Sequence, residues 1–315
     1  MKKKQTKFIS IVTPVFDEES NIENLIKDVS IIISDFNKKS TTNITYEHIV
    51  IDNQSQDNTK PILRKLAKNL PYLKVIFNLK NYGQHISPFY AVCQSSGDAV
   101  ITLAGDFEDP IDLIPKLIKS WLCGNYVTCA VRKSSEYNYF SNLIRNIYYK
   151  QLDKLSSKIN IQNFSGYGIF DKEVINRLKK LNEPNPYFRS LVVNFGYKIN
   201  LIYYDKKNRS SGSSKNNLDT LIDTALLGIV TIGDYFPILI LKINILIIFL
   251  FLLSLIIFVI DIISLNLFVY FSLFLTFIIG FVNLLCLLLI IHKFNQFDLK
   301  ISNSNVVIEE ERLNF

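Results

Sequence analysis

The sequence predicts an α/β protein with a mostly parallel sheet, followed by a short amphipathic helix and two membrane-spanning helices. Two observations support this prediction. Between residues 8 and 132, β-branched runs alternate with segments of helical periodicity, which is the pattern of parallel strands joined by crossover helices. From about residue 239 the chain becomes almost wholly apolar, as membrane segments do.

Each predicted strand before residue 133 is followed by a predicted helix or a polar turn. The strands are expected at 8–16, 46–52, 73–78, 98–104 and 125–132. The helices are expected after Ser20 and at 58–69, 85–96 and 110–121. Ser20 and Glu23 have the spacing of a capping box, so Ser20 is the predicted N-cap of the first helix.

After residue 133 the pattern loosens. It predicts a helix over 136–155, a strand or loop at 163–170, a helix at 171–181 and a strand at 197–205. A polar loop follows this strand and leads into the apolar part of the chain.

Polar and charged residues gather where the predicted strands end. The strand-end segments are 14–19, 52–57, 81–84 and 106–109, together with Arg132. Ligands of open α/β sheets bind beyond the carboxyl ends of the strands, so this clustering predicts a site at that edge. The turn after the first strand, TPVFDEES, has no glycine, which excludes dinucleotide binding of the GxGxxG type.

Carboxylates dominate these strand ends, and three of them lie in LAGDFEDP at 103–110. Carboxylates do not grip a diphosphate directly, but they hold a divalent cation that does, and they accept hydrogen bonds from a base or a ribose. Asp57 and Asp109 each precede a predicted helix and so suit N-caps. Asp106 is not placed as a cap, which makes it the strongest candidate for a functional acid.

The net charge and the cysteine content restrict the classes of binding partner and the cellular compartment that we expect. The formal charge is +7, but the basic residues are scattered and form no recognisable nucleic-acid motif, so no nucleic-acid partner is expected. A basic domain beside a membrane suits anionic headgroups and phosphates better. The four cysteines form no CxxC pair, which is typical of a reducing compartment.

The chain divides into four expected regions. They are a globular domain at 1–217, an interfacial amphipathic helix at 218–237, a two-helix transmembrane hairpin at 238–292 and a tail at 293–315. The spans, about 239–260 and 265–291, are each near the roughly 20 residues needed to cross a bilayer. A buried core hairpin is the alternative, but the second run is too long and too uniformly apolar for one.

Charge asymmetry predicts the orientation. The segment DIISLN between the spans has no Lys or Arg, whereas basic residues flank their outer ends. The positive-inside rule therefore places the globular domain and both termini in the cytoplasm, in a multi-pass protein of the cell membrane. Packing of the spans or the amphipathic helix between protomers leaves a homo-oligomer open.

Five motifs occur in the order found in glycosyltransferase family 2. They are TPVFDEESNIENL, IDNQSQDNT, NYGQHISPFYAV, LAGDFEDPIDLI and NRSSGSSK. With the two C-terminal spans, they most resemble its polyprenyl-phosphate branch, which includes dolichyl-phosphate mannose synthases and bactoprenol glucosyltransferases. The resemblance implies a GT-A, Rossmann-like fold, a nucleotide-sugar donor and Mg²⁺ or Mn²⁺.

The resemblance also implies roles by position for the donor site. Pro14, Phe16 and Glu18 would line the nucleobase pocket, and Asp52 would bind uracil or ribose. Asp106 would be the metal-binding acid.

Other implied roles concern the metal and the phosphates. Glu108, where the family often has Gln, would be a second metal ligand. Arg132, Arg209 and Lys215 would contact the phosphates of donor and acceptor and neutralise the leaving diphosphate. Arg209 and Lys215 enclose a Ser/Gly segment just before the expected amphipathic helix, where a lipid phosphate would lie. A flexible linker is the alternative reading of that segment.

Two positions depart from the family pattern. The usual Asp-Ala-Asp metal motif is Ala104-Gly105-Asp106 here, so one carboxylate is absent. The usual Gly-Asp-Phe-Arg segment is SGYG at 165–168, so Gly166 replaces the Asp proposed as a base in some relatives. A polyprenyl phosphate is already anionic near neutral pH and needs no base, so this change favours a lipid-phosphate acceptor over a sugar hydroxyl.

Three hypotheses follow. The first is a membrane-anchored inverting hexosyltransferase of cell-envelope glycan biosynthesis. It would move a sugar from a UDP-sugar to polyprenyl (undecaprenyl) phosphate on the cytoplasmic leaflet. The second is the same fold acting on a glycan or glycolipid hydroxyl. The third, motivated by Ala104 and Gly166, is a catalytically silent scaffold. The sequence does not name the sugar.

Overall fold

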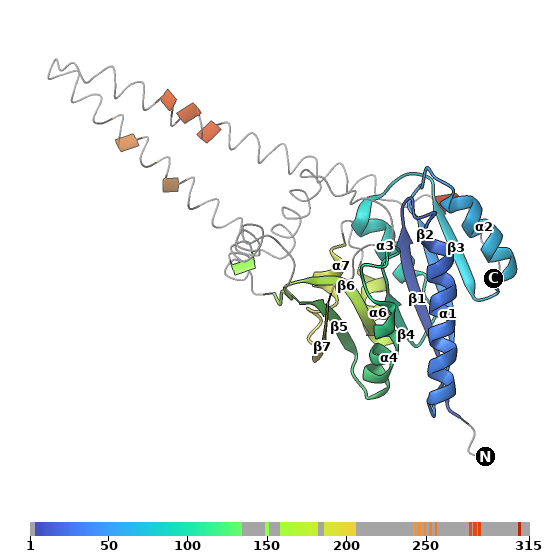
Figure 1. The fold of residues 1–315 in the computed structure, drawn as a ribbon. Coiled ribbons are helices and arrows are strands. Elements are labelled where there is room, and N and C mark those ends of the chain that lie inside the picture. The colour runs from blue at the N-terminus through green and yellow to red at the C-terminus, as the bar shows by residue number, and fades with distance from the viewer. Residues whose placement is uncertain are drawn as a thin grey trace.

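The computed structural model describes residues 4–133, 149–150, 158–181 and 186–205, with isolated positions from 242 to 284 and at 308–309. The described residues form an eight-stranded sheet with helices on both faces (Figure 1). The strands are β1 (Thr6–Val15), β2 (Asn43–Asp52), β3 (Leu73–Asn78), β4 (Ala99–Thr102), β5 (Val127–Arg132), β6 (Phe164–Asp171), β7 (Ile199–Tyr204) and β8 (Ile308–Glu309). The helices are α1 (Ile22–Lys39), α2 (Thr59–Asn69), α3 (Gly83–Cys93), the 3₁₀ turn η1 (Ile111–Leu113), α4 (Ile114–Leu122), α6 (Lys172–Lys180) and α7 (Phe188–Leu191).

The strand order is β7-β5-β6-β4-β1-β2-β3-β8. β1 pairs in parallel with β2 and β4, β2 with β3, and β5 with β7. The expected mostly parallel sheet is therefore confirmed. β6 runs antiparallel between β4 and β5, which brings the start of β6 to the edge where β4 and β5 end. At the far edge, β8 pairs antiparallel with the end of β3.

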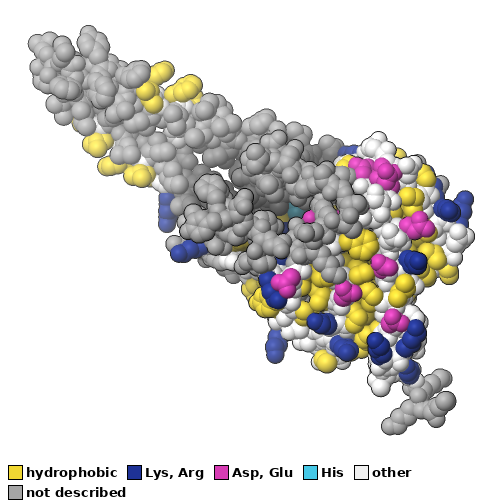
Figure 2. All heavy atoms as spheres, in the orientation of Figure 1, with side chains coloured by type: hydrophobic (Ala, Val, Ile, Leu, Met, Phe, Trp, Pro, Cys, Tyr) yellow, Lys and Arg dark blue, Asp and Glu magenta, His cyan; other side chains and the backbone are white. Residues whose placement is uncertain are grey.

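Two apolar layers cover the sheet because successive side chains of a strand point to opposite faces. Ile9 and Ile11 of β1 pack in the layer that contains α1 and α4, whereas Val12 packs in the layer that contains α3 and α6. Burial on both faces explains why the central strands read as continuous apolar runs rather than alternating ones. Figure 2 shows that Lys, Arg and carboxylate side chains are interspersed over the described residues of one face.

The expected strands and helices agree with the observed ones to within a few residues, and the segment at 163–170 is the strand β6. The predicted capping box is wrong. α1 begins at Ile22 with Asn21 as its N-cap and no side-chain cap bond. Instead, the Asn21 amide donates to the Glu18 carboxylate over 2.7 Å. Only 149–150 of the helix expected at 136–155 is described.

The expected amphipathic helix at 218–237, the hairpin at 238–292 and the tail at 293–315 fall outside the described residues, apart from the isolated positions. Arg209 and Lys215 also lie outside them. Among the helices of the part that the structure describes, none combines the length and apolar character needed to cross a membrane.

Candidate active site

The carboxyl edge of the sheet is built first from the loops after β1 and β2, which bond to each other. The Asp17 amide donates to Ser55 Oγ over 2.8 Å, and the Gln56 amide donates back to Asp17 Oδ1 over 2.6 Å. The Glu18 amide donates to Thr59 Oγ1 over 2.8 Å. These bonds hold the two loops in a fixed arrangement next to the strand ends.

Among the described residues, four other than glycine have left-handed backbone, and all lie at this edge. They are Asp17 (φ 52°), Gln54 (φ 66°) and Phe107 (φ 60°), in the loops after β1, β2 and β4, and Asn163 (φ 60°), just before β6. Such conformations are uncommon for residues with a side chain and gather at functional sites. Their position agrees with a binding edge at the ends of these strands.

Asp52 ends β2 and is fully buried. Its Oδ2 accepts from the Ser55 amide over 3.1 Å and lies 4.0 Å from Lys60 Nζ, whereas Oδ1 is buried without a hydrogen-bond partner. Burial raises the pKa of Asp52, against the opposing effects of Ser55 and Lys60. A buried acceptor without a donor is costly, so this oxygen is suited to a ligand that donates a hydrogen bond.

The predicted nucleobase residues lie at the same edge. Pro14 is half-buried and aligned with Ile51 in the β1–β2 register, one residue before the pair Val15 and Asp52. Phe16, also half-buried, follows the end of β1. Glu18 accepts the Asn21 bond described above, which makes it part of the turn into α1.

A network of asparagines was not anticipated. Asn53 Oδ1 accepts from Asn78 Nδ2 over 3.0 Å and from the Tyr82 amide over 2.9 Å, and Asn53 Nδ2 donates to Asn81 over 2.8 Å. Asn78 also donates to Ser87 of α3 over 2.9 Å. The ends of β2 and β3 are thereby tied to the start of α3. In the sequence, this network is indicated only by the asparagine side chains at the ends of two apolar strands.

Asp106 and Glu108 occupy the loop after β4. Asp106 is half-buried, and its Oδ1 accepts from the Glu108 amide over 3.1 Å. Glu108 Oε2 lies 3.4 Å from Arg132 Nη1. Within the described residues, no three His, Cys, Asp or Glu side chains are grouped as a metal site. A cation here would therefore take most of its ligands from bound phosphate and water, which is how Mg²⁺ usually binds.

Asp109 is not a helix cap, contrary to the sequence prediction. The following 3₁₀ turn has Pro110 as its N-cap without a side-chain bond. The Asp109 carboxylate, only 2% exposed, accepts from Arg132 Nε (3.2 Å) and Nη2 (2.8 Å), from the Tyr204 hydroxyl and from Ser165 Oγ (3.3 Å). Burying an unpaired carboxylate costs more free energy than leaving a helix without a side-chain cap, so the Asp109 side chain pairs with Arg132.

Arg132 is consequently fixed in orientation. Burial by itself lowers its pKa, but the charge of Asp109, the neighbouring Tyr204 and the hydrogen bonds to both residues together raise the pKa above its ordinary value. With Nε and Nη2 held by Asp109, Nη1 faces Glu108. β5 runs parallel to β4, so this guanidinium stands at the same edge as the Asp106 loop.

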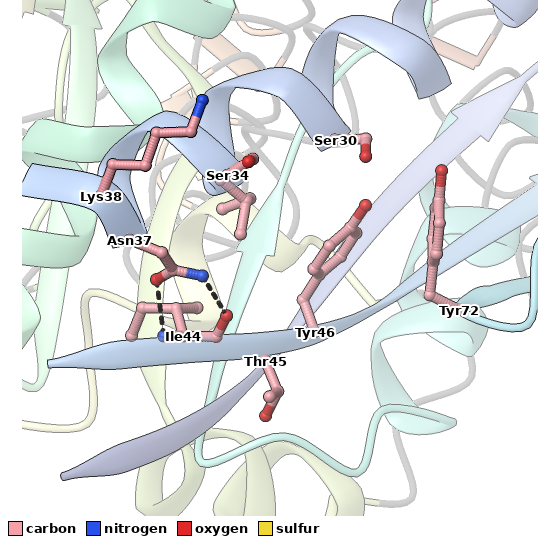
Figure 3. Close-up of a pocket in the computed structure, with 9 residues that line it drawn as sticks. Ser30, Ser34, Asn37, Lys38, Ile44, Thr45, Tyr46 and Tyr72 are labelled. Carbon is pink, nitrogen blue, oxygen red and sulfur yellow. Dashed lines mark hydrogen bonds between the residues drawn. The ribbon is translucent and has the colours of Figure 1, made fainter. Parts of the chain in front are cut away.

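A separate open groove lies at the opposite end of the sheet. It has a volume of about 620 Å³ and is lined by α1 and the start of β2. Tyr46 and Tyr72 stand side by side in it with their hydroxyls toward Ser30, and Asn37 bonds to the backbone of Ile44 (Figure 3). It contains none of the carboxylates described above.

Comparisons with known proteins identify the family of this chain and several similar proteins. The model of the family described as "Glycosyl transferase family 2" matches residues 10–179. An uncharacterised glycosyltransferase of Synechocystis sp. is 27% identical over 222 residues, covering 70% of this chain and 68% of that protein. A bactoprenol glucosyl transferase of Shigella phage SfV is 30% identical over 230 residues, covering 72% of each chain. Glucosyl-3-phosphoglycerate synthase from Mycobacterium tuberculosis, solved with UDP, is 18% identical with a TM-score of 0.48, covering 70% of this chain and 80% of that chain.

Proposed function

The chain belongs to glycosyl transferase family 2 and has a GT-A-like α/β fold, and on this premise we propose that it transfers a sugar from a UDP-sugar to polyprenyl phosphate. The observation that carries the proposal is the similarity to bactoprenol glucosyl transferases, 30% identical over 72% of each chain. The name of those proteins points to a polyprenol lipid, and we infer that this chain uses the phosphate of such a lipid as its acceptor.

The buried strand-end carboxylate supports a nucleotide donor. Asp52 Oδ1 lacks a partner within the described residues, and the N–H of uracil or a ribose hydroxyl would supply one. Pro14 and Phe16, at the end of the neighbouring strand, would contact the base. Backbone strain at Asp17 and Gln54 is consistent with loops shaped around a ligand.

The residues fit a divalent cation bound through few protein ligands. Asp106 would hold Mg²⁺ or Mn²⁺ together with the donor diphosphate, whereas Glu108 is directed at Arg132 and would be a weaker second ligand. When bound, the cation neutralises negative charge on the diphosphate. Arg132, held by Asp109, would add a fixed positive charge at the same edge.

The reaction needs no protein base when the acceptor is a phosphate. An oxygen of the lipid phosphate attacks the anomeric carbon from the side opposite the UDP group, a new C–O bond forms, and the bond to UDP breaks. UDP leaves with the electron pair, and the configuration inverts. Gly166, which has no side chain to take a proton, is compatible with this chemistry and less so with a hydroxyl acceptor.

We also propose that the chain is anchored in the cell membrane with its α/β domain in the cytoplasm. The support comes from the apolar runs at 239–260 and 265–291 and from their charge asymmetry. Most described side chains of these runs are apolar and exposed, such as Phe249 (61%) and Phe277 (72%), and the polar exceptions are Lys242 and Asn283. Exposed apolar side chains in this number suit a lipid environment better than water.

The direct test mixes membranes containing the chain with labelled UDP-sugars, Mg²⁺ and polyprenyl phosphate. We expect label in a lipid that mild acid hydrolyses, as a sugar phosphodiester does. Label in an acid-stable glycolipid or glycan would instead establish a hydroxyl acceptor. If no sugar is transferred and calorimetry shows no cation-dependent binding of any UDP-sugar, the supported function is a catalytically silent scaffold.

A further inference from the structure

A second basic cluster lies at the carboxyl edge, on the α3 face of the sheet. His85 belongs to the first turn of α3, and Arg189 belongs to α7. Both side chains contact the ring of Tyr187. The His85 and Tyr187 ring centroids are 5.4 Å apart, and Arg189 Cζ is 5.9 Å from the Tyr187 centroid. All three residues are half-buried.

Neither basic side chain of this cluster is satisfied within the part of the chain that the structure describes. His85 Nε2 is buried and has no hydrogen-bond partner there. Arg189 makes no ion pair with a described carboxylate, in contrast to Arg132, which is paired with Asp109 and Glu108. Partial burial of a guanidinium that has no carboxylate partner costs free energy, unless a bound anion neutralises its charge.

Gly166 opens the space beside Arg189. It has a left-handed backbone with φ +102°, and a Cβ at this position would lie 3.8 Å from Arg189 Cγ and 3.9 Å from Phe188 Cδ1. Its carbonyl accepts from Thr102 at the end of β4, so the cluster borders the strand that leads into the Asp106 loop. Any other residue here would place a side chain against the aliphatic stem of Arg189, and glycine leaves that position open.

The chemistry of the cluster matches a phosphate group. Burial, and secondarily the charge of Arg189, lowers the pKa of His85 to about 4, so the imidazole is neutral at physiological pH. A neutral imidazole offers one N–H donor, and the guanidinium offers a charge and a planar set of donors. Together they suit a monoester phosphate, whereas uncharged sugar hydroxyls would not compensate Arg189.

We propose that Arg189 and His85 form the subsite that binds the phosphate of the lipid acceptor. This inference rests on the proposed function and adds residues that the strand-end carboxylates and Arg132 do not include. The donor diphosphate carries the same chemistry, so the test must separate the two sources.

The first experiment uses the full-length chain in detergent, with farnesyl phosphate as a soluble prenyl phosphate and UDP as the donor probe. In Arg189→Ala, we expect farnesyl phosphate to bind about tenfold or more weakly by calorimetry, because a charge-assisted contact is lost. UDP affinity should be unchanged and serves as the check of folding. The matched control is Arg177→Ala, since Arg177 is exposed and already paired with Glu173 at 3.3 Å. His85→Ala should weaken farnesyl phosphate binding less than Arg189→Ala.

The second experiment compares Gly166→Asp with Gly166→Asn. Asp and Asn tolerate left-handed backbone similarly and better than most residues, so both variants carry the same strain. Only Asp places a negative charge beside Arg189. We expect Gly166→Asp to bind farnesyl phosphate at least several-fold more weakly than Gly166→Asn, because a carboxylate competes with the phosphate for the guanidinium.

The inference is overturned if wild type binds no farnesyl phosphate, or if Arg189→Ala binds it as wild type does. A loss of UDP affinity in Arg189→Ala, with farnesyl phosphate binding intact, would assign Arg189 to the donor instead. Failure of the proposed function has a different signature. A chain that binds farnesyl phosphate through Arg189 but transfers no sugar to polyprenyl phosphate keeps this subsite and rejects the transfer reaction.

Discussion

Arg132 Nη2 donates to Asp109 Oδ1 over 2.8 Å, and this buried ion pair joins the end of β5 to the loop after β4. The Tyr204 hydroxyl, from the edge strand β7, bonds to both residues. The pair therefore holds three elements at the carboxyl edge and leaves the Nη1 side of Arg132 facing Glu108. Its removal should affect both stability and catalysis.

Asp109→Ala should destabilise the α/β domain by roughly 3 kcal/mol, because it leaves the Arg132 charge largely buried without its carboxylate. The sole tryptophan, Trp121, is 8% exposed in α4, so its fluorescence during urea unfolding reports on this domain. The matched control is Asp205→Ala, which breaks the exposed ion pair with Lys133 at 3.0 Å. It should cost less than about 1 kcal/mol. Equal effects of the two variants would contradict the structural role of Asp109.

Asp52→Asn should weaken binding of uridine by about tenfold or more. The substitution removes the negative charge of the carboxylate, and this charge strengthens the hydrogen bond that uridine would donate to Oδ1. Uridine is the suitable probe because it has no phosphate that titrates. In wild type, uridine affinity should fall as the pH drops through the raised pKa of Asp52. Calorimetry on Asp52→Asn should show no such pH dependence. Uridine binding that is unchanged by the substitution would remove Asp52 from the nucleotide site.

The same substitution should stabilise the fold at neutral pH. The pKa of Asp52 is raised above its ordinary 3.8 by burial, so its ionised form destabilises the folded state above both pKa values. The penalty disappears as pH falls through the raised value toward 3.8. Urea unfolding should therefore show Asp52→Asn more stable than wild type at pH 7, with the difference vanishing in acid.

Asp106→Asn should reduce sugar transfer by about a hundredfold or more, because the proposed metal-binding charge is lost. Glu108→Gln should reduce transfer by less than about tenfold, since Glu108 is directed at Arg132 and Mg²⁺ needs few carboxylates. Initial rates over a range of Mg²⁺ concentrations distinguish the two. Full activity of Asp106→Asn would reject its role, and an equal loss in Glu108→Gln would make both residues ligands.

Glu47→Gln should destabilise the fold at neutral pH by about 2 kcal/mol through the loss of charged hydrogen bonds. Glu47 is 3% exposed in β2 and lies 2.6 Å from Lys74 Nζ, with Ser10 and Ser96 also donating to it. Burial alone raises its pKa, but these partners lower it overall.

The sign of the Glu47 effect is opposite to that of Asp52. A lowered pKa stabilises the fold above the ordinary value of 4.5, and this stability is lost as the pH falls through the folded value. Urea unfolding should therefore show the difference between wild type and Glu47→Gln shrinking below pH 4.5. A difference that is independent of pH would mean that packing, rather than charge, accounts for the effect.

The sequence by itself determined the order and type of the elements before residue 133 and the acidity of the strand ends. Both follow from local properties. A β-branched run buried on two faces and a helix with one apolar face each have a characteristic periodicity, and parallel strands place their carboxyl ends at one edge. Asp52 and Asp106 could therefore be chosen from the sequence as candidates for the site.

Only the tertiary structure decided which polar groups meet. Asp109 looked like a helix cap because its neighbours in sequence suggest one, yet its carboxylate pairs with Arg132, 23 residues away, once both are buried. The antiparallel insertion of β6 brings Gly166 beside Arg189 and near the end of β4. Such pairings depend on desolvation and on distances between elements that are remote in the chain, and no local pattern encodes them.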